Sequence, residues 1–199
     1  MRKFTTRKLT MYAAVLTLSA GMTYAQNKGR GRGRGRGPAG PGMTLTSPDF
    51  TDGGVIPNKF TQASQNPPSP KLEWSHVPNG TMSFVLLFHD PDVALNKTTN
   101  DVTHWLIFNI PGTARELQQG VPAEATLPDG AINAKNLRGG VGYMGPGAGA
   151  AGPYHHYTFA LFALDEKLPL GPDATRDEVM KAIQGHILAK AVLEGRFHR

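Results

Sequence analysis

Three ionisable side chains in the sequence stand at the ends of apolar runs, where folding can bring them together. Asp90 closes one apolar run, His104 opens the next, and His155 directly precedes a third. A carboxylate that accepts a hydrogen bond from an imidazole fixes the ring's tautomer and raises its pKa. We therefore predict that Asp90 orients His104 and that the histidine then faces an anion.

The adjacent pair His155 and His156 does not predict a metal site. Successive side chains of a strand point to opposite faces, so His155 shares a face with Tyr157 while His156 points the other way. The sequence has no cysteine and no His-Glu-x-x-His motif. We expect no metal and no cofactor.

A glycine-rich segment, "GYMGPGAGAAGP" (142–153), runs directly into His155. Glycines let the backbone approach a ligand closely, and their N–H groups can converge on an oxyanion. The spacing matches neither a Walker loop nor a dinucleotide fingerprint. For Asp92, two residues after Asp90, a turn role is favoured over cation binding. No Gly-x-Ser-x-Gly motif is present, so a catalytic triad is not expected.

The elements that position these side chains are predicted to be strands. The runs 82–90, 104–110 and 157–164 are almost continuously apolar, which is typical of strands covered on both faces. A closing strand is predicted over 191–198. The pattern indicates a mainly β fold.

One short helix is predicted near the C-terminus. Thr175 and Glu178 have the spacing of a capping box, and Val179, Ile183 and Ile187 recur every four residues. The spacing predicts that these three apolar side chains share one helix face.

The first residues have the pattern of an export signal. Residues 1–25 begin with basic residues, continue with a short apolar run and end in Ala25, so cleavage and a periplasmic or secreted location are expected. The run is too short to span a bilayer, so no stable membrane insertion is expected. An Arg/Gly-rich flexible linker is predicted over 26–43, followed by one folded domain over 44–199.

The net charge of +6 does not indicate a nucleic-acid-binding domain. Residues 1–42 contain nine of the 21 Lys and Arg residues and no acid, which leaves 12 basic against 15 acidic residues and a net charge of −3 for the remainder. The Arg-Gly tract also lacks the interleaved aromatic residues that stack on bases. We expect no nucleic-acid partner.

Several segments in order resemble the phosphatidylethanolamine-binding protein family, in its bacterial Raf-kinase-inhibitor-like branch. The resemblance covers residues 44–199. Its stretches are "FTDGGVIPNKFT" (50–61), "SPKLEWSHVPNGTMSFVLLFHDPD" (69–92), "HWLIFNIPG" (104–112), "GYMGPGAGAAGPYHHYTFALFALD" (142–165) and "ATRDEVMKAIQGHILAKAVLEGRF" (174–197).

The resemblance implies a sandwich of two antiparallel sheets of Greek-key character with a few short helices, and a small cavity for anionic groups. It assigns the ligand-binding residues of that cavity to Asp90, His104, Gly145, Pro146, His155 and Tyr157. His156 stands where the family often has arginine, outside the cavity. The implied ligand is a phosphate or another phosphorylated group, such as a phospholipid head group.

The sequence departs from the family's pattern around this cavity. Val93 and Ala94 replace the usual Ala-Pro after the DPD motif, and residues 93–103 lack a bordering aromatic residue. We expect a more mobile rim and a different ligand preference.

Three functions remain open from the sequence. A non-enzymatic binding protein is favoured. The alternative is a protein-interaction module that inhibits a kinase or protease, and a phosphoester hydrolase ranks last. A homodimer is left open.

Overall fold

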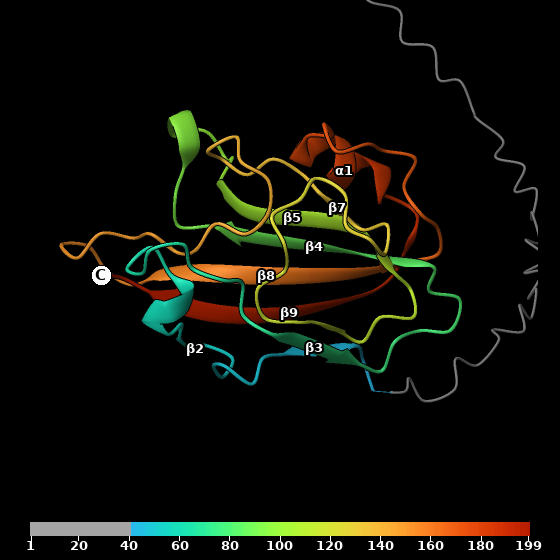
Figure 1. Ribbon diagram of the computed structural model, residues 1–199, viewed down its shortest axis with the longest axis horizontal. Coiled ribbons are helices and arrows are strands. Elements are labelled where there is room, and N and C mark those ends of the chain that lie inside the picture. Colours follow the sequence, from blue (N-terminus) through green and yellow to red (C-terminus); the bar gives the residue numbers. More distant parts are fainter. Residues whose placement is uncertain (1–40) are drawn as a thin grey trace, which may run out of the picture. The chain divides into compact units, whose positions relative to one another are not determined.

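The predicted apolar runs form the long strands of a six-stranded sheet (Figure 1). The structure is a computed structural model that describes residues 41–199. The predicted signal peptide (1–25) lies outside these residues, as does the predicted linker (26–43) up to residue 40. The long strands are β4 (Ser83–Asp90), β5 (Val102–Pro111), β8 (His155–Leu164) and β9 (Ile187–Phe197).

The strand order confirms the Greek-key prediction. The large sheet has the order β2-β9-β8-β4-β5-β7, so β8 returns to pair with β4 after the chain has formed β5 and β7. β7 is Ile132–Asn133 and β2 is Gly54–Val55. β2 pairs with β9 in parallel, so this sheet is not purely antiparallel as predicted. The parallel pair involves two residues of β2 at the edge of the sheet.

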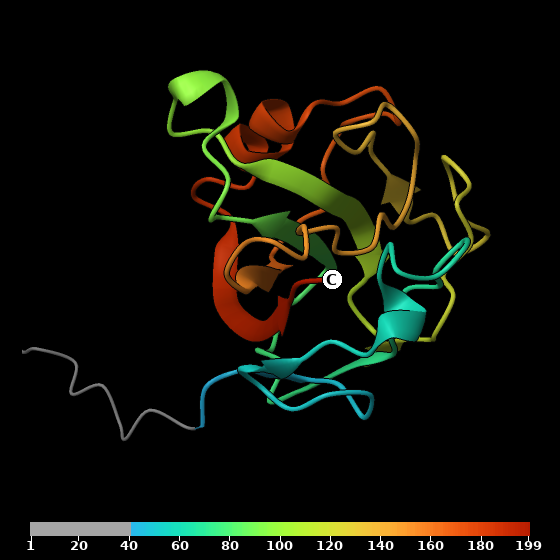
Figure 2. The ribbon, with the colours of Figure 1, turned by 90° about the vertical axis from the view of Figure 1, so that its left-hand side faces the viewer.

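A second sheet of three short antiparallel strands covers one face of the large sheet (Figures 1 and 2). It contains β1 (Thr44–Thr46), β3 (Leu72–Ser75) and β6 (Glu116–Leu117). Two sheets in face-to-face contact make the predicted sandwich.

Alternation along β4 fills two separate cores. Phe84 points toward the small sheet, where its ring meets the Trp74 ring edge to face at 5.3 Å between centroids. The next residue, Val85, points to the opposite face and packs in a cluster with Val179 and Ile183 from the helical side. β4 is therefore covered on both faces, which explains its continuous apolar sequence.

The helix α1 (Arg176–Ala182) is shorter than predicted. The capping box is confirmed: Thr175 accepts a hydrogen bond from the Glu178 N–H, and the Glu178 carboxylate accepts one from the Thr175 N–H. Ile187 does not lie on the helix, because the chain turns at Gly185 with φ of 88° and Ile187 begins β9. Two 3-10 turns, η1 (Asn58–Phe60) and η2 (Leu95–Lys97), lie in loops.

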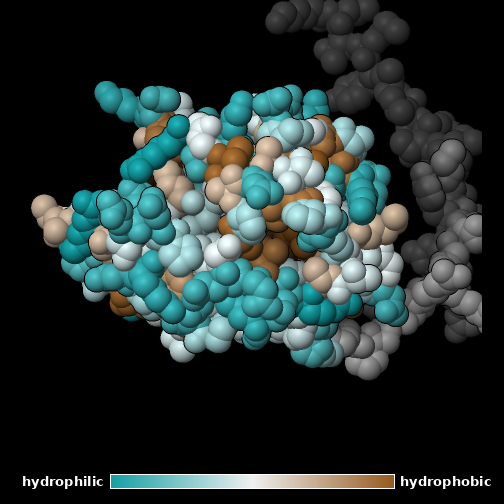
Figure 3. All heavy atoms as spheres, in the orientation of Figure 1, coloured by the Kyte–Doolittle hydropathy of each residue, from teal (hydrophilic) through white to brown (hydrophobic). Residues whose placement is uncertain are grey.

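The surface of the described region is mixed. Hydrophobic side chains gather near the middle of the face shown in Figure 3, over the region of β5 and β7, with hydrophilic side chains around them. Within residues 41–199, no helix is long and apolar enough to cross a membrane.

Candidate functional site

Strand directions bring the predicted site residues to one end of the large sheet. β4 runs antiparallel to both β5 and β8, so the end of β4 lies beside the beginnings of its two neighbours. Asp90 ends β4, His155 begins β8, and His104 is the third residue of β5. The three side chains line one cavity of about 250 Å³.

Asp90 orients His155, and not His104 as predicted. The His155 Nδ1–H donates to Asp90 Oδ2 at 2.8 Å, and the backbone N–H of Asp92 donates to Asp90 Oδ1 at 3.0 Å. Asp90 is only 3% exposed. Because both carboxylate oxygens have donors, the buried charge is compensated, and His155 keeps Nε2 for a ligand.

His104 is held by a backbone carbonyl. Its Nδ1–H donates to the Met144 carbonyl oxygen at 2.9 Å, which leaves Nε2 as the nitrogen available to a ligand. Burial lowers the pKa of His104, although the bond to Met144 and the charge of Asp90 both oppose that shift. The predicted rise in its pKa is therefore wrong, because desolvation outweighs the carboxylate's influence.

Tyr157 joins the glycine-rich segment to the floor of the cavity. Its hydroxyl oxygen accepts hydrogen bonds from the N–H groups of Gly147 and Ala148 at 3.2 and 3.1 Å. Burial, together with the charge of Asp90, raises the pKa of Tyr157 to about 12. The hydroxyl therefore keeps its proton at neutral pH and remains a donor.

Gly145 and Pro146 lie beside the cavity and do not line it. The Gly145 carbonyl accepts from Gln62 Nε2 and the Pro146 carbonyl accepts from the Gln62 N–H, both at 2.8 Å. Gly147 and Ala148 do line the cavity, and their backbone N–H groups donate to the Tyr157 hydroxyl. The expectation that N–H groups near Gly145 cradle a ligand is replaced by a structural role for this segment.

Gly145→Ala is expected to destabilise the domain by about 1–3 kcal/mol. A Cβ at this position would lie 2.6 Å from the Phe60 carbonyl oxygen and 2.9 Å from Thr61 Cα. Gly149→Ala is the matched control in the same segment, because a Cβ there meets nothing within 4 Å. Urea unfolding measures both variants, and equal stabilities would contradict a close approach at Gly145.

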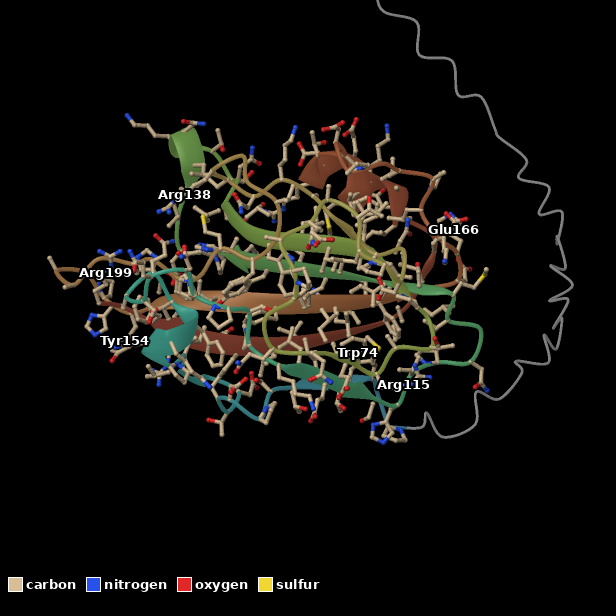
Figure 4. All side chains as sticks on the ribbon, in the orientation of Figure 1. Trp74, Arg115, Arg138, Tyr154, Glu166 and Arg199 are labelled. Carbon is tan, nitrogen blue, oxygen red and sulfur yellow. The ribbon has the colours of Figure 1, made fainter. Side chains whose placement is uncertain are left out.

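The cavity also contains residues that the sequence analysis missed. Arg138 and Gln62 stand at its rim, and Arg138 Nη2 donates to Gln62 Oε1 at 2.6 Å. Arg199 Nη2 donates to the Gln62 carbonyl at 3.3 Å, and Figure 4 shows both arginines at the end of the molecule that Figure 2 faces. Both come from loop or terminal segments without hydrophobic periodicity, so only the fold identifies them. Apolar residues complete the lining: Val93, Val102, Leu137 and Met144.

His156 lies outside the cavity, in agreement with strand alternation. The carboxylate oxygen Oδ2 of Asp92 accepts from the His156 N–H at 2.7 Å and from its Nδ1–H at 2.9 Å. Partial burial opposes ionisation of Asp92, but these hydrogen bonds prevail and lower its pKa. Asp92 therefore anchors the loop after β4 to β8.

A hollow of about 420 Å³ beside α1 is larger but is less suited to a charged ligand. Its Asp101 and Arg176 form an ion pair, and His89 Nδ1 donates to Asp101 at 2.7 Å. Burial raises the pKa of Asp101, but the hydrogen bonds from Arg176 and His89 outweigh it and lower the pKa overall. The two charges of this ion pair therefore compensate each other, and Lys135, which also lines the hollow, pairs with Asp173 at 3.1 Å. In residues 41–199, no three His, Asp or Glu side chains are arranged to hold a metal ion.

The comparison with protein families identifies the chain. Residues 46–198, most of the chain, match the family described as phosphatidylethanolamine-binding protein. The chain belongs to this family. Members of this family are generally non-enzymatic binding proteins, so family membership supports a binding function.

Relatives span the same region. A UPF0098 protein of Methanothermobacter thermautotrophicus is 40% identical over 157 residues, which are 79% of this chain and 99% of the relative. UPF0098 protein YbhB of Escherichia coli is 33% identical over 161 residues, 78% of this chain and 99% of the relative.

Solved structures agree with the fold. A crystal structure of a putative phosphatidylethanolamine-binding protein homolog from Chlamydia trachomatis has a TM-score of 0.69 and 30% identity, and the match covers 80% of this chain and 99% of that one. The crystal structure of Escherichia coli YbcL has a TM-score of 0.68 and 27% identity with the same coverage.

The stability of the domain is expected to fall as the pH decreases below the ordinary histidine value of 6.5. Because burial lowers the pKa of His104, the unfolded chain takes up a proton at a higher pH than the folded chain does. Protonation therefore favours unfolding between these two values, with a slope of at most about 1.4 kcal/mol per pH unit.

Urea unfolding of the wild type and of His104→Gln between pH 7.5 and 5 measures this dependence. The variant should show a shallower fall in the free energy of unfolding over this range. Equal slopes in the two proteins would contradict a lowered pKa at His104.

Proposed function

We propose that this chain is a non-enzymatic binding protein whose cavity accepts a phosphoryl or similar anionic group, such as a phospholipid head group. The observation that carries the proposal is the Asp90–His155 pair at the cavity wall, with Arg138 at the rim. Asp90 accepts from Nδ1–H of the imidazole and so orients the ring, which leaves Nε2 for a ligand. The Arg138 guanidinium donates to anionic oxygens throughout the neutral pH range, and His155 Nε2 does so when the ring carries both protons.

Two further groups support an anionic ligand. The Tyr157 hydroxyl remains protonated, and its two acceptor positions are already occupied by the N–H groups of Gly147 and Ala148. Its O–H therefore remains the donor, toward the Asp90 carboxylate that lines the same cavity or toward a ligand beside it.

His104 also lines the cavity; because its Nδ1–H donates to Met144 and burial lowers its pKa, Nε2 of the neutral ring is an acceptor for a protonated ligand oxygen. A phosphoryl group can accept from Tyr157 and Arg138 through its anionic oxygens, and its monoprotonated form can donate an O–H to His104.

The lining favours binding over turnover. Among the described residues that line the cavity, there is no serine, threonine, cysteine or lysine. Aspartate and histidine can also attack phosphorus, but both Asp90 oxygens and the Nδ1 atoms of His104 and His155 are already hydrogen bonded within the protein. In the part of the chain that the structure describes, no three His, Asp or Glu side chains are arranged to hold a metal that would activate a water. We therefore propose that a bound phosphate ester leaves the site unchanged.

Calorimetric titration with inorganic phosphate and with sulfate tests the proposal between pH 5 and 8. Affinity should increase toward low pH, because an imidazole that carries both protons donates through Nε2 as well as through Nδ1. Sulfate keeps its charge over this range, so its pH dependence reports on the protein alone. Failure of both anions to bind, or affinity for sulfate that is independent of pH, would contradict the proposal.

We also propose that the protein is exported to the periplasm or secreted, which the pattern of residues 1–25 supports. Mass spectrometry of the protein isolated from its native cells should give a chain that begins at Gln26. A mature chain that retains Met1 would contradict cleavage.

A further inference from the structure

A groove continues from the cavity on the far side of Arg138. It has a volume of about 460 Å³ and shares Gln62, Arg138 and Met144 with the cavity. The cavity's volume of about 250 Å³ lies below the roughly 300–1,000 Å³ usual for small-molecule sites, whereas the groove lies within that range. A ligand that fills only the cavity would leave the larger part of this depression unused.

Arg138 and Gln62 form the boundary between the two spaces, and their geometry is fixed. Gln62 receives a hydrogen bond from Arg138 through Oε1 and donates one to the Gly145 carbonyl through Nε2. The backbone N–H of Arg138 donates to Asn136 Oδ1 at 3.0 Å, which anchors the base of the side chain. A guanidinium has five N–H donors, so Arg138 retains donors for a ligand that crosses this boundary.

The walls of the groove are suited to an uncharged group. Among the described residues that line it, Arg138 is the one that carries a charge at neutral pH, and Pro67, Ala123 and Tyr143 present apolar surface. The Tyr143 hydroxyl donates to the Phe60 carbonyl at 2.7 Å, so its polar group is already satisfied. The Tyr143 ring stacks on Phe88 at 5.5 Å and 9°, which holds the ring in one orientation.

We propose that the ligand is a phosphate ester with a bulky, uncharged organic substituent. Its phosphoryl group lies in the cavity, Arg138 contacts the ester at the boundary, and the substituent lies in the groove beside Tyr143, Pro67 and Ala123. This inference rests on the proposed function and defines its ligand class. The cavity and the groove meet at Arg138, so one ligand can place its anionic group in the cavity and its substituent in the groove.

Calorimetric titration with methyl phosphate and phenyl phosphate, which carry the same charged group, tests the inference. Phenyl phosphate should bind the wild type at least about tenfold more tightly, because burial of an aromatic ring contributes on this scale. In the variant Ala123→Phe, the larger side chain would occupy the groove. Ala123 is exposed, so the substitution does not disturb the core. It should reduce the preference for phenyl phosphate to less than about threefold and leave the affinity for methyl phosphate unchanged.

Ala125→Phe is the matched control, because Ala125 is exposed in the same loop and does not line the groove. It should retain the preference for phenyl phosphate. If neither ester binds the wild type, the proposed function fails and the inference fails with it. If both esters bind equally, or if Ala123→Phe keeps the full preference, the groove is not a substituent site while the anion cavity stands.

Discussion

His155→Ala is expected to weaken binding of inorganic phosphate by at least about tenfold, whereas His156→Ala should change it less than about twofold. His155 supplies a donor from the cavity wall, and its loss leaves the buried carboxylate of Asp90 without the imidazole that compensates it. His156 is adjacent in sequence, but it points to the other face of β8, where it pairs with Asp92. Calorimetric titration of the three proteins at pH 6 measures the difference.

Asp90→Asn tests the orientation of the imidazole separately. An amide can meet His155 Nδ1 through either its oxygen or its NH2 group, so it fixes the ring's orientation less strictly than the carboxylate does, and binding should weaken. Thermal unfolding of each variant verifies that the domain is folded. Equal losses in His155→Ala and His156→Ala would contradict the assignment of one histidine of the pair to the cavity.

Phe88→Ala is expected to reduce the free energy of unfolding by about 3–5 kcal/mol. The Phe88 ring is fully buried and stacks on Phe159 at 3.9 Å on one side and on Tyr143 at 5.5 Å. It also lies 5.4 Å from the His104 ring and 6.0 Å from the Tyr157 ring. Its removal would leave a cavity in the core directly beneath the site.

Urea unfolding at pH 7.5 measures this loss, with Leu188→Ala as the control. Leu188 is 41% exposed on β9, so its truncation should cost less than about 1 kcal/mol. A loss in Phe88→Ala no larger than that of the control would show that the aromatic cluster does not support the domain.

The long strands could be predicted because they are apolar on both faces, and each face packs in a different hydrophobic core. Alternate residues of β4 face the small sheet and the helical side, and both sets are apolar. The short strands β1, β2, β6 and β7 carry too few residues for a periodic signal, and Ile187 kept a helical spacing beyond the turn at Gly185. Local patterns of this kind do not reveal where a glycine reverses the chain.

The site residues that lie on strands could be predicted from the sequence, whereas those in loops could be predicted less well. Asp90, His104, His155 and Tyr157 line one cavity because neighbouring strand ends meet there. The pairing within the site depends on side-chain directions, which is why Asp90 binds His155 and His104 binds the Met144 carbonyl. Arg138 reaches the rim from a loop whose course depends on the whole fold.

The central claim is that a phosphoryl group binds between His104 and His155. Nuclear magnetic resonance of the histidine ring nitrogens, recorded during titration with O-phosphorylethanolamine at pH 6, tests it most directly. His186 is an internal control, because it pairs with Asp165 and approaches Glu166 to 3.4 Å, at the end of the molecule opposite Arg138 (Figure 4). We expect saturable shifts at His155 and His104 with one common affinity and no shift at His186. Saturation without any change at His155 and His104 would contradict the claim.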